Sequence, residues 1–208
     1  GPEIRFITIE GVGFATLVDS LLAIKHFVYD EQKFTIAELK EALVNNFQGK
    51  REYIIMQTTL KNRGPKFGND LDEADELARN IMETWSSETF KYKTDTDFQF
   101  RGGMLSWNYW AGEDAAYTPA TPNGRLANTF LSNAICPTNG ADINGPTSVT
   151  NSVGNALGGK TDDGKYVNYL PNGASHTITF NPSMLREPES KEKFKAYLRG
   201  YIENGGTA

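Results

Sequence analysis

Residues 64–75 read Gly-Pro-Lys-Phe-Gly-Asn-Asp-Leu-Asp-Glu-Ala-Asp, and residues 144–147 read Asn-Gly-Pro-Thr. The glycines and the proline of the first stretch predict a tight turn, and its carboxylates are typical of a first helical turn, where they complement the helix dipole. We expect the helix to open at Asp70 and Glu73. Apolar residues then recur at helical spacing, namely Leu71, Ala74, Leu77, Ala78, Ile81, Met82 and Trp85. The sequence therefore predicts a turn and a buried helix.

The chain before this turn predicts a strand and two helices. Ile4–Ile9 is short, β-branched and followed by glycines, which indicates a buried strand that leads into a turn. Apolar residues within 15–28 cover more than one face of a helix, so this helix should be buried. Thr35 and Glu38 form a capping box, because each can bond the other's backbone amide, and they predict a helix to about Phe47.

The chain after the turn is divided into a loop-rich part and a final helix. Between Gly102 and Gly173, the residues Gly, Asn, Pro, Thr and Ser dominate, but interspersed aromatic and aliphatic residues favour an ordered structure within a larger scaffold. The final helix should begin at a Ser190 cap and end near Gly205. Its apolar face would consist of Phe194, Tyr197, Leu198, Tyr201 and Ile202.

The composition excludes several classes of protein. A net charge of -5 and a pI near 5.2 argue against nucleic-acid binding, which requires a basic surface. Polar residues interrupt the longest apolar stretch, Phe14–Val28, so no segment is predicted to span a membrane. A single cysteine, Cys136, excludes an internal disulfide, and we expect a cytoplasmic protein. The length suits one domain with a sizeable core.

Two motifs suggest nucleotide binding, but their context argues against it. Gly154–Thr161 matches the P-loop pattern, with Lys160 in the phosphate-binding position. Polar residues precede it where a P-loop needs a hydrophobic strand, and Asp162 and Asp163 follow it where a helix should begin. The strand, glycine turn and helix at the start of the chain also resemble a dinucleotide-binding fold, but Thr16 replaces the third glycine. A structural glycine turn is the simpler interpretation.

Metal-binding and nucleophilic sites are not indicated. His26 and His176 lie far apart in the sequence and lack ligands at zinc-site spacing, so we expect solvated or core histidines and no metal. Cys136 lies between apolar residues and a proline, which is typical of a small buried side chain. The carboxylates of residues 70–76 lack the alternating spacing of a calcium loop, and they fit a helix N-terminus better.

Several stretches carry a resemblance to a known family, and they occur in its order. They are Asp19–Leu21, Ala23–Lys25, Val28 and Asp30; Asn46–Gly49; Pro65–Asp70 with Asp72 and Asp75; Pro122–Arg125; and Gly140, Asp142, Asn144–Thr147, Ser152 and Val153. These stretches resemble the glycyl radical enzymes, the pyruvate formate-lyase-like family. Pro122–Arg125 is similar to the family's Pro-Asp-Gly-Arg turn, with Asn123 in place of Asp. The resemblance covers nearly the whole chain.

The resemblance implies an α/β fold, namely part of a ten-stranded β/α barrel with residues 1–208 as a C-terminal portion. The family's thiyl cysteine lies in a Gly-Cys-x-Glu-Pro context, which Cys136-Pro137-Thr138 does not match. Its radical glycine lies in an Arg-Val-x-Gly loop, which this sequence also lacks. We therefore expect a fragment that is inactive by itself, and we assign no catalytic residue.

The same resemblance implies a lyase, dehydratase or decarboxylase that acts on a small organic substrate. The intact parent would be an anaerobic homodimer whose glycyl radical is installed by a radical S-adenosylmethionine activase with an iron-sulfur cluster. Trp107, Asn108 and Tyr109 are the candidate substrate-binding residues, because polar and aromatic side chains alternate along Met104–Trp110. A buried strand that packs its aromatic residues in the core is the alternative for this segment. A non-catalytic nucleotide-binding or interaction domain is the alternative function.

Overall fold

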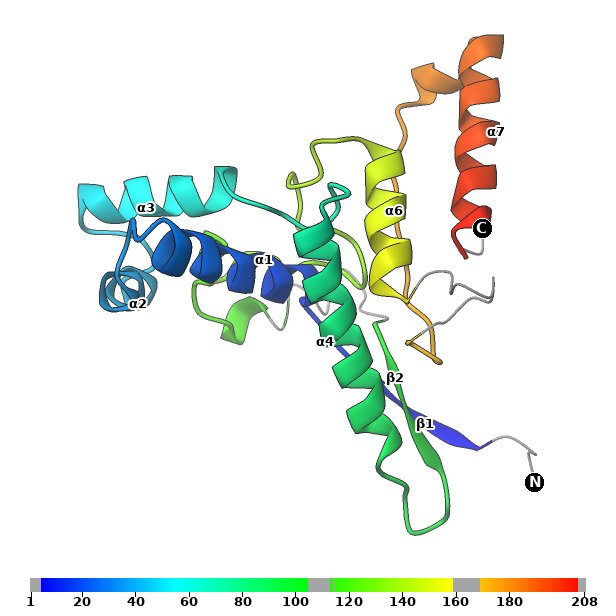
Figure 1. Cartoon of the computed structure of the whole chain (residues 1–208), viewed down its shortest axis with the longest axis horizontal. Coiled ribbons are helices and arrows are strands. Elements are labelled where there is room, and N and C mark those ends of the chain that lie inside the picture. The colour runs from blue at the N-terminus through cyan, green and yellow to red at the C-terminus, as the bar shows by residue number, and fades with distance from the viewer. Residues whose placement is uncertain (1–4, 105–112, 114, 159–168, 206–208) are drawn as a thin grey trace.

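The computed structural model describes residues 5–104, 113, 115–158 and 169–205. The elements in chain order are β1 (Phe6–Glu10), α1 (Phe14–Ile24), the π-helical turn η1 (Lys25–Asp30), α2 (Ile36–Val44), α3 (Arg51–Asn62), α4 (Asp72–Phe90), β2 (Gln99–Gly103), α6 (Pro146–Ala156), the 3-10 helix η2 (Pro182–Leu185) and α7 (Pro188–Glu203). Figure 1 shows α4 beside the two strands, α1–α3 to one side of it, and α6 and α7 to the other. The fold is mixed α/β, as the sequence predicts.

β1 and β2 form a parallel pair in which Phe6 lies opposite Gln99 and Glu10 opposite Gly103. The predicted first strand is confirmed in place, but its predicted burial is wrong, since the side chains of Phe6 and Ile7 are 40% and 41% exposed. Within the described residues the sheet has only these two strands; the outer edge of β1 has no neighbouring strand, whereas the outer edge of β2 is partly paired, through the bridges Lys93–Gln99 and Met104–Ala174. In the βαβ unit of a dinucleotide-binding fold, the second strand comes directly after the first helix. Here β2, the partner strand of β1, comes only after α2, α3 and α4.

The larger core lies between α1, α4 and α6. Phe14 of α1 meets Phe67 edge to face with ring centroids 5.4 Å apart, and Met82 of α4 and Val153 of α6 complete the same cluster. The predicted burial of the first helix on more than one side is confirmed, and the helix continues beyond Ile24 as the π-helical turn η1. This core fixes the segments before α4 and α6, which are the two motifs quoted first above.

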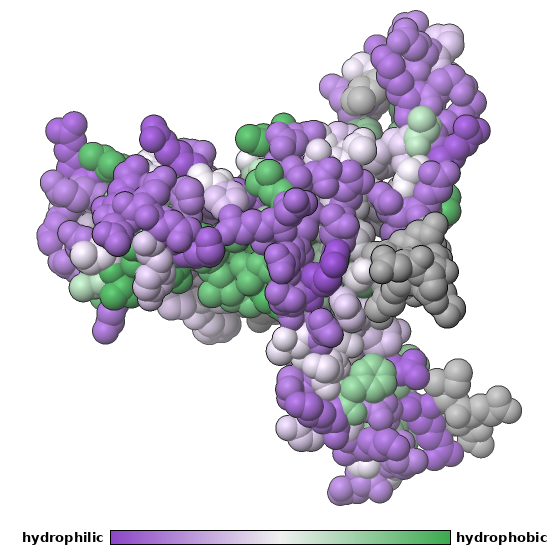
Figure 2. All heavy atoms as spheres, viewed as in Figure 1, coloured by the Kyte–Doolittle hydropathy of each residue, from purple (hydrophilic) through white to green (hydrophobic). Residues whose placement is uncertain are grey.

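A smaller core joins the end of α1 to α2 and α3. Phe27, Leu39, Met56 and Leu60 are buried in it. The Thr35–Glu38 capping box is confirmed: the Glu38 amide donates to Thr35 Oγ1, and the Thr35 amide donates to Glu38 Oε2. Figure 2 shows hydrophobic residues at the surface of this α1–α3 arm. Exposed apolar side chains there are Leu17, Leu21, Ile36, Val44, Ile54 and Ile55.

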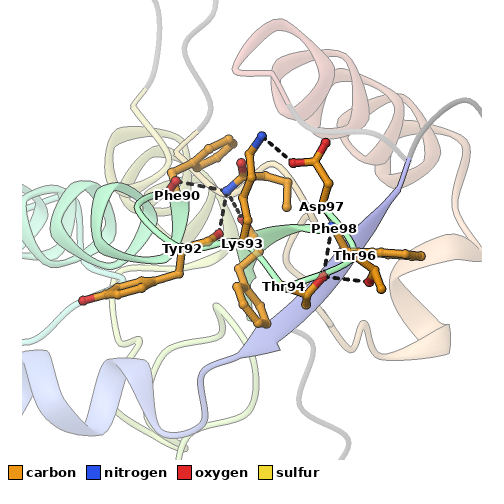
Figure 3. A network of polar contacts seen from close by, with 9 residues as sticks. Phe90, Tyr92, Lys93, Thr94, Thr96, Asp97 and Phe98 are labelled. Carbon is orange, nitrogen blue, oxygen red and sulfur yellow. Dashed lines mark hydrogen bonds and ion pairs between the residues drawn. The ribbon is translucent and has the colours of Figure 1, made fainter.

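A polar turn connects α4 to β2. Figure 3 shows Thr94 at its centre, where Thr94 Oγ1 accepts a hydrogen bond from the Phe98 amide and contacts the Thr96 hydroxyl. Lys93 Nζ lies 3.0 Å from Asp97 Oδ1. The turn brings β2 back along α4, and Gly102 approaches so closely that an added Cβ would lie 2.9 Å from the Trp85 ring. Helix α4 therefore covers β2 directly.

Two predicted helix starts are wrong. Asp70 is not a cap of α4, because it adopts a left-handed conformation (φ 56°) and its amide donates to Ser152 Oγ. Helix α7 begins at Pro188 with Glu187 as its N-cap, since proline fits a first helical position that needs no amide, and Ser190 lies inside the helix. Gly205, with φ 88°, follows α7 as predicted.

Candidate functional site

The two motifs, residues 64–75 and 144–147, meet in the structure through Asn69. Its Oδ1 accepts from the amides of Ile143 and Asn144, at 2.9 and 3.2 Å. Its Nδ2 donates to the carbonyl oxygens of Lys66 and Ala141. A buried side-chain amide with all of these partners costs little to desolvate. Asn69 therefore fastens the loop before α6 to the turn before α4.

Asp19 of α1 fastens the same loop from a second direction. The side chain is fully buried, Oδ1 accepts from the Phe67 amide at 2.9 Å, and Oδ2 accepts from Thr138 Oγ1 at 2.7 Å. Burial raises the pKa of Asp19 above its ordinary value, although the positive charge of Lys66 and both hydrogen bonds act to lower it. The carboxyl group thus joins α1, the turn before α4 and the loop before α6.

The N-terminus of α1 is capped from outside the helix. The N-cap residue of α1 is Gly13, with a φ of 81°, and it has no side chain that could bond the first amides of the helix. Instead the Thr16 amide donates to Ser132 Oγ, and the Ser132 amide donates to Thr16 Oγ1, both at 3.0 Å. The first amides of a helix have no acceptor within the helix, and Ser132 Oγ supplies one for the Thr16 amide. This reciprocal pair binds the loop-rich part of the chain to α1.

Arg125 organises the loop that leads to Ser132. Its guanidinium donates to the carbonyl oxygens of Thr118, Pro119, Leu126 and Thr129, and its Nε donates to Thr121 Oγ1. All five guanidinium N–H donors therefore have an acceptor. The side chain is buried, and burial lowers the pKa of Arg125. Arg125 is a structural centre of this loop and has no donor left for a ligand.

These connections surround a cavity of about 320 Å³. Asp19, Lys66, Arg125 and Thr138 line it, together with Lys61 at the end of α3 and Asn139 of the loop before α6. A volume of this size is within the range of small-molecule pockets. The cavity has charged groups from three separate parts of the chain, namely α1, the segment of Lys61 and Lys66, and the Arg125 loop.

A second group of side chains lies where residues 130–146 face residues 175–180. Cys136 Sγ accepts from the Thr177 amide at 3.3 Å, and a cavity of about 370 Å³ adjoins it. The thiol is half-buried instead of fully buried, and burial raises its pKa, so the reactive thiolate is disfavoured. Burial also lowers the pKa of His176, whose Nδ1 has no hydrogen-bond partner in the structure. His176 and Asp142 line a neighbouring cavity of about 460 Å³.

The candidate substrate residues Trp107, Asn108 and Tyr109 lie outside the described residues, as does Lys160 of the P-loop match. Gly154 of that match belongs to α6, so a helix precedes Lys160 where a P-loop has a strand. Among the residues that the structure describes, no group of three potential metal ligands comes together, and no helix has the length and hydropathy needed to cross a bilayer.

Sequence reasoning missed the junction residues Asp19, Asn69 and Thr138 as a group. Asp19 had one signal, a carboxylate within an otherwise apolar helix, which is rarely buried without partners. Asn69 had another, since it lies within a turn motif directly before a helix. Neither signal says which distant segment supplies the partners.

Comparisons with known proteins agree with this architecture. Residues 1–111 match the family model described as pyruvate formate lyase-like. The chain is 34% identical over 200 residues to the trans-4-hydroxy-L-proline dehydratase of Clostridioides difficile, with 95% of this chain and 23% of the relative covered. It is 34% identical over 207 residues to the isethionate sulfite-lyase of Oleidesulfovibrio alaskensis, with 93% and 22% covered.

Solved structures give the same result. The B12-independent glycerol dehydratase of Clostridium butyricum matches with a TM-score of 0.84 and 34% identity over 99% of this chain and 24% of that chain. A Roseburia inulinivorans structure described for 1,2-propanediol dehydration matches with a TM-score of 0.86 and 30% identity, covering 99% and 25%. The chain thus spans about a quarter of the length of these relatives. It belongs to the pyruvate formate lyase-like family of glycyl radical enzymes.

Proposed function

We propose that residues 1–208 are a C-terminal portion of a glycyl radical enzyme that acts as a lyase, dehydratase or decarboxylase on a small organic substrate. The observation that supports this most is a match that continues over 99% of the chain with a TM-score of 0.84 and 34% identity to a glycerol dehydratase. The names of the relatives include dehydratases, a sulfite-lyase and an indoleacetate decarboxylase, which is the basis for the three reaction types.

The proposal includes a place for the chain within a ten-stranded β/α barrel. The open outer edge of β1 and the exposed Phe6 and Ile7 of this strand support it, because a further barrel strand and the helices around it would cover them. Trp107, Asn108 and Tyr109 would contribute to the substrate wall, and they follow the end of β2 by a few residues in the sequence. No described residue is proposed as a catalytic group.

The radical chemistry would come from a glycyl radical installed by a radical S-adenosylmethionine activase with an iron-sulfur cluster. Such a radical reacts with oxygen, so an anaerobic cytoplasm suits the intact protein, which we propose to be a homodimer. Cys136 would not carry the thiyl radical, since its sequence context differs from Gly-Cys-x-Glu-Pro.

Electron paramagnetic resonance tests this function. The full-length gene product that contains this chain would be incubated anaerobically with a radical S-adenosylmethionine activase, S-adenosylmethionine and a reductant. We expect a glycyl radical spectrum that disappears on exposure to air. The proposal is wrong if the purified, folded protein gives no radical with activases that load the C. difficile and C. butyricum relatives in parallel reactions. Saturable ATP binding by the same protein would favour the nucleotide-binding alternative.

A further inference from the structure

The ammonium group of Lys66 is buried beside a cavity and has few partners. Its residue is 8% exposed, and Nζ donates one hydrogen bond, at 2.7 Å, to the carbonyl oxygen of Leu60 near the C-terminus of α3. A lysine ammonium has three N–H donors. Lys66 lines the cavity, and the Leu60 carbonyl oxygen is the one hydrogen-bond acceptor of Nζ among the described residues, which leaves two N–H donors without a protein acceptor.

Asp19 does not complete the coordination of this ammonium. The carboxylate attracts Lys66 electrostatically, but the two groups form no direct ion pair in the structure. Both Asp19 oxygens accept from other donors, the Phe67 amide and the Thr138 hydroxyl. Burial lowers the pKa of Lys66, which means that a second negative charge near it would stabilise the protonated form.

The rest of the cavity adds positive charge and free donors. Lys61 lines it with an ammonium that has no partner in the described structure, and Asn139 lines it with a side-chain amide that has none. Arg125 contributes a third positive charge, although its donors are occupied. Asp19 is the single carboxylate among the lining residues. The cavity therefore has an excess of positive charge in a partly dry environment, where charge-assisted hydrogen bonds are strong.

We propose that this cavity binds a small oxyanion, either a phosphate or a carboxylate group, through Lys66 with Lys61 and Asn139 at its rim. The anion would accept the two remaining Lys66 donors and would compensate the charge that Asp19 leaves partly unpaired. The volume of about 320 Å³ accommodates the anionic group of a small metabolite. This site does not depend on the activity proposed above, since no radical step involves it.

Calorimetric titration of the full-length protein tests the site at constant ionic strength. Inorganic phosphate and acetate are the two probes, and they distinguish a phosphate ligand from a carboxylate ligand; methylammonium is the cationic control. We expect saturable binding of at least one of the two anions and none of methylammonium. Lys66→Met should weaken the affinity about tenfold or more, because it removes charged hydrogen bonds, and Lys61→Met should weaken it by a smaller factor.

Two further variants keep the test decisive. Lys195→Met removes an exposed lysine of α7 that pairs with Glu192, and it should leave anion affinity unchanged. If Lys66→Met does not fold, the exposed Lys61→Met replaces it, with circular dichroism as the check of folding. The proposal is overturned if neither anion binds, or if folded Lys66 and Lys61 variants bind both anions as the unmodified protein does. Loss of binding in Lys195→Met would equally overturn it.

Discussion

Asn144 donates two hydrogen bonds to Asn69: its backbone amide donates to Asn69 Oδ1 at 3.2 Å, and its Nδ2 donates to the Asn69 carbonyl oxygen at 3.1 Å. The two residues come from turns that precede different helices, α4 and α6. The α4–α6 packing continues below them, where Asn155 Nδ2 donates to Asp75 Oδ2. The pair therefore sets the relative position of the two helix starts.

Asn69→Ala should loosen this connection. It leaves the amides of Ile143 and Asn144 and the Ala141 carbonyl oxygen without their partner, which we expect to cost about 2–4 kcal/mol of local stability. Hydrogen–deuterium exchange of peptides that cover 141–149 in the full-length protein measures it. Asn80→Ala, on the exposed side of α4, is the matched control. Equal protection of 141–149 in both variants would contradict the role given to Asn69.

Gly124 should tolerate no side chain. A Cβ there would lie 2.8 Å from the Gln57 carbonyl oxygen, and the residue has a φ of 88°. Gly140 has a similar φ of 76° but open space around it, so an alanine there measures only the strain of the left-handed backbone conformation. We expect Gly140→Ala to cost about 1 kcal/mol and Gly124→Ala about 2–4 kcal/mol. Exchange protection of α3 peptides distinguishes the two, and similar protection in both variants would show that the close approach is absent.

Asp19 should make stability depend on pH. Because its pKa is raised in the folded state, the folded protein binds more protons than the unfolded chain just above the ordinary value of 3.8. Its contribution is therefore favourable at low pH and decreases as the pH rises through the folded-state pKa. Asp19→Asn keeps an acceptor for the Phe67 amide and lacks this dependence. Urea midpoints of the two proteins should converge at acidic pH, and parallel pH profiles would argue against the raised pKa.

Cys136 should be unreactive and dispensable for the radical. Burial raises the pKa of its thiol, so alkylation by iodoacetamide at neutral pH should be slower than that of free cysteine. In the full-length enzyme, Cys136→Ser should keep the fold, the glycyl radical and most turnover, at a cost of about 1–2 kcal/mol. Serine at the parent's cysteine in the Gly-Cys-x-Glu-Pro context should abolish turnover. Complete loss of turnover in Cys136→Ser with the radical intact would make Cys136 the radical carrier.

The 208-residue chain expressed alone should be poorly soluble or molten. The exposed Phe6 and Ile7 of β1, the open edge of this strand and the apolar side chains on the α1–α3 arm favour self-association. Size-exclusion chromatography and calorimetry measure this. A monodisperse monomer with one sharp thermal transition would contradict the expectation.

The elements that the sequence predicts well are those with strong local signals. The Thr35–Glu38 capping box and the apolar spacing of α4 are local and were confirmed. Helix α3 was missed, because Ile54 and Ile55 are exposed apolar residues next to the buried Tyr53 and Met56, which obscures the helical period. Strand β2 was missed because Gln99–Gly103 contains glycines and polar residues that are rare in strands.

The candidate site was harder to predict than the helices. The resemblance marked Asp19, Asn69 and Asn144 as family residues, but the hydrogen bonds that their side chains make join positions 48 to 119 residues apart in the sequence. Local propensity has no information on such pairs. The buried Lys66 was likewise invisible, since lysine is ordinarily exposed and only the packed structure removes it from water.

The parallel pairing of β1 with β2 has a consequence for how the chain folds. About ninety residues, which include the helices α1–α4 and the π-helical turn η1, separate the two strands, so their pairing is a high contact-order interaction and is slow to form. During synthesis β1 emerges first and waits roughly 4–18 s for β2 at ordinary translation rates. Its phenylalanine and isoleucines are unpaired over that interval, which makes the start of this segment the natural target for a nascent-chain chaperone.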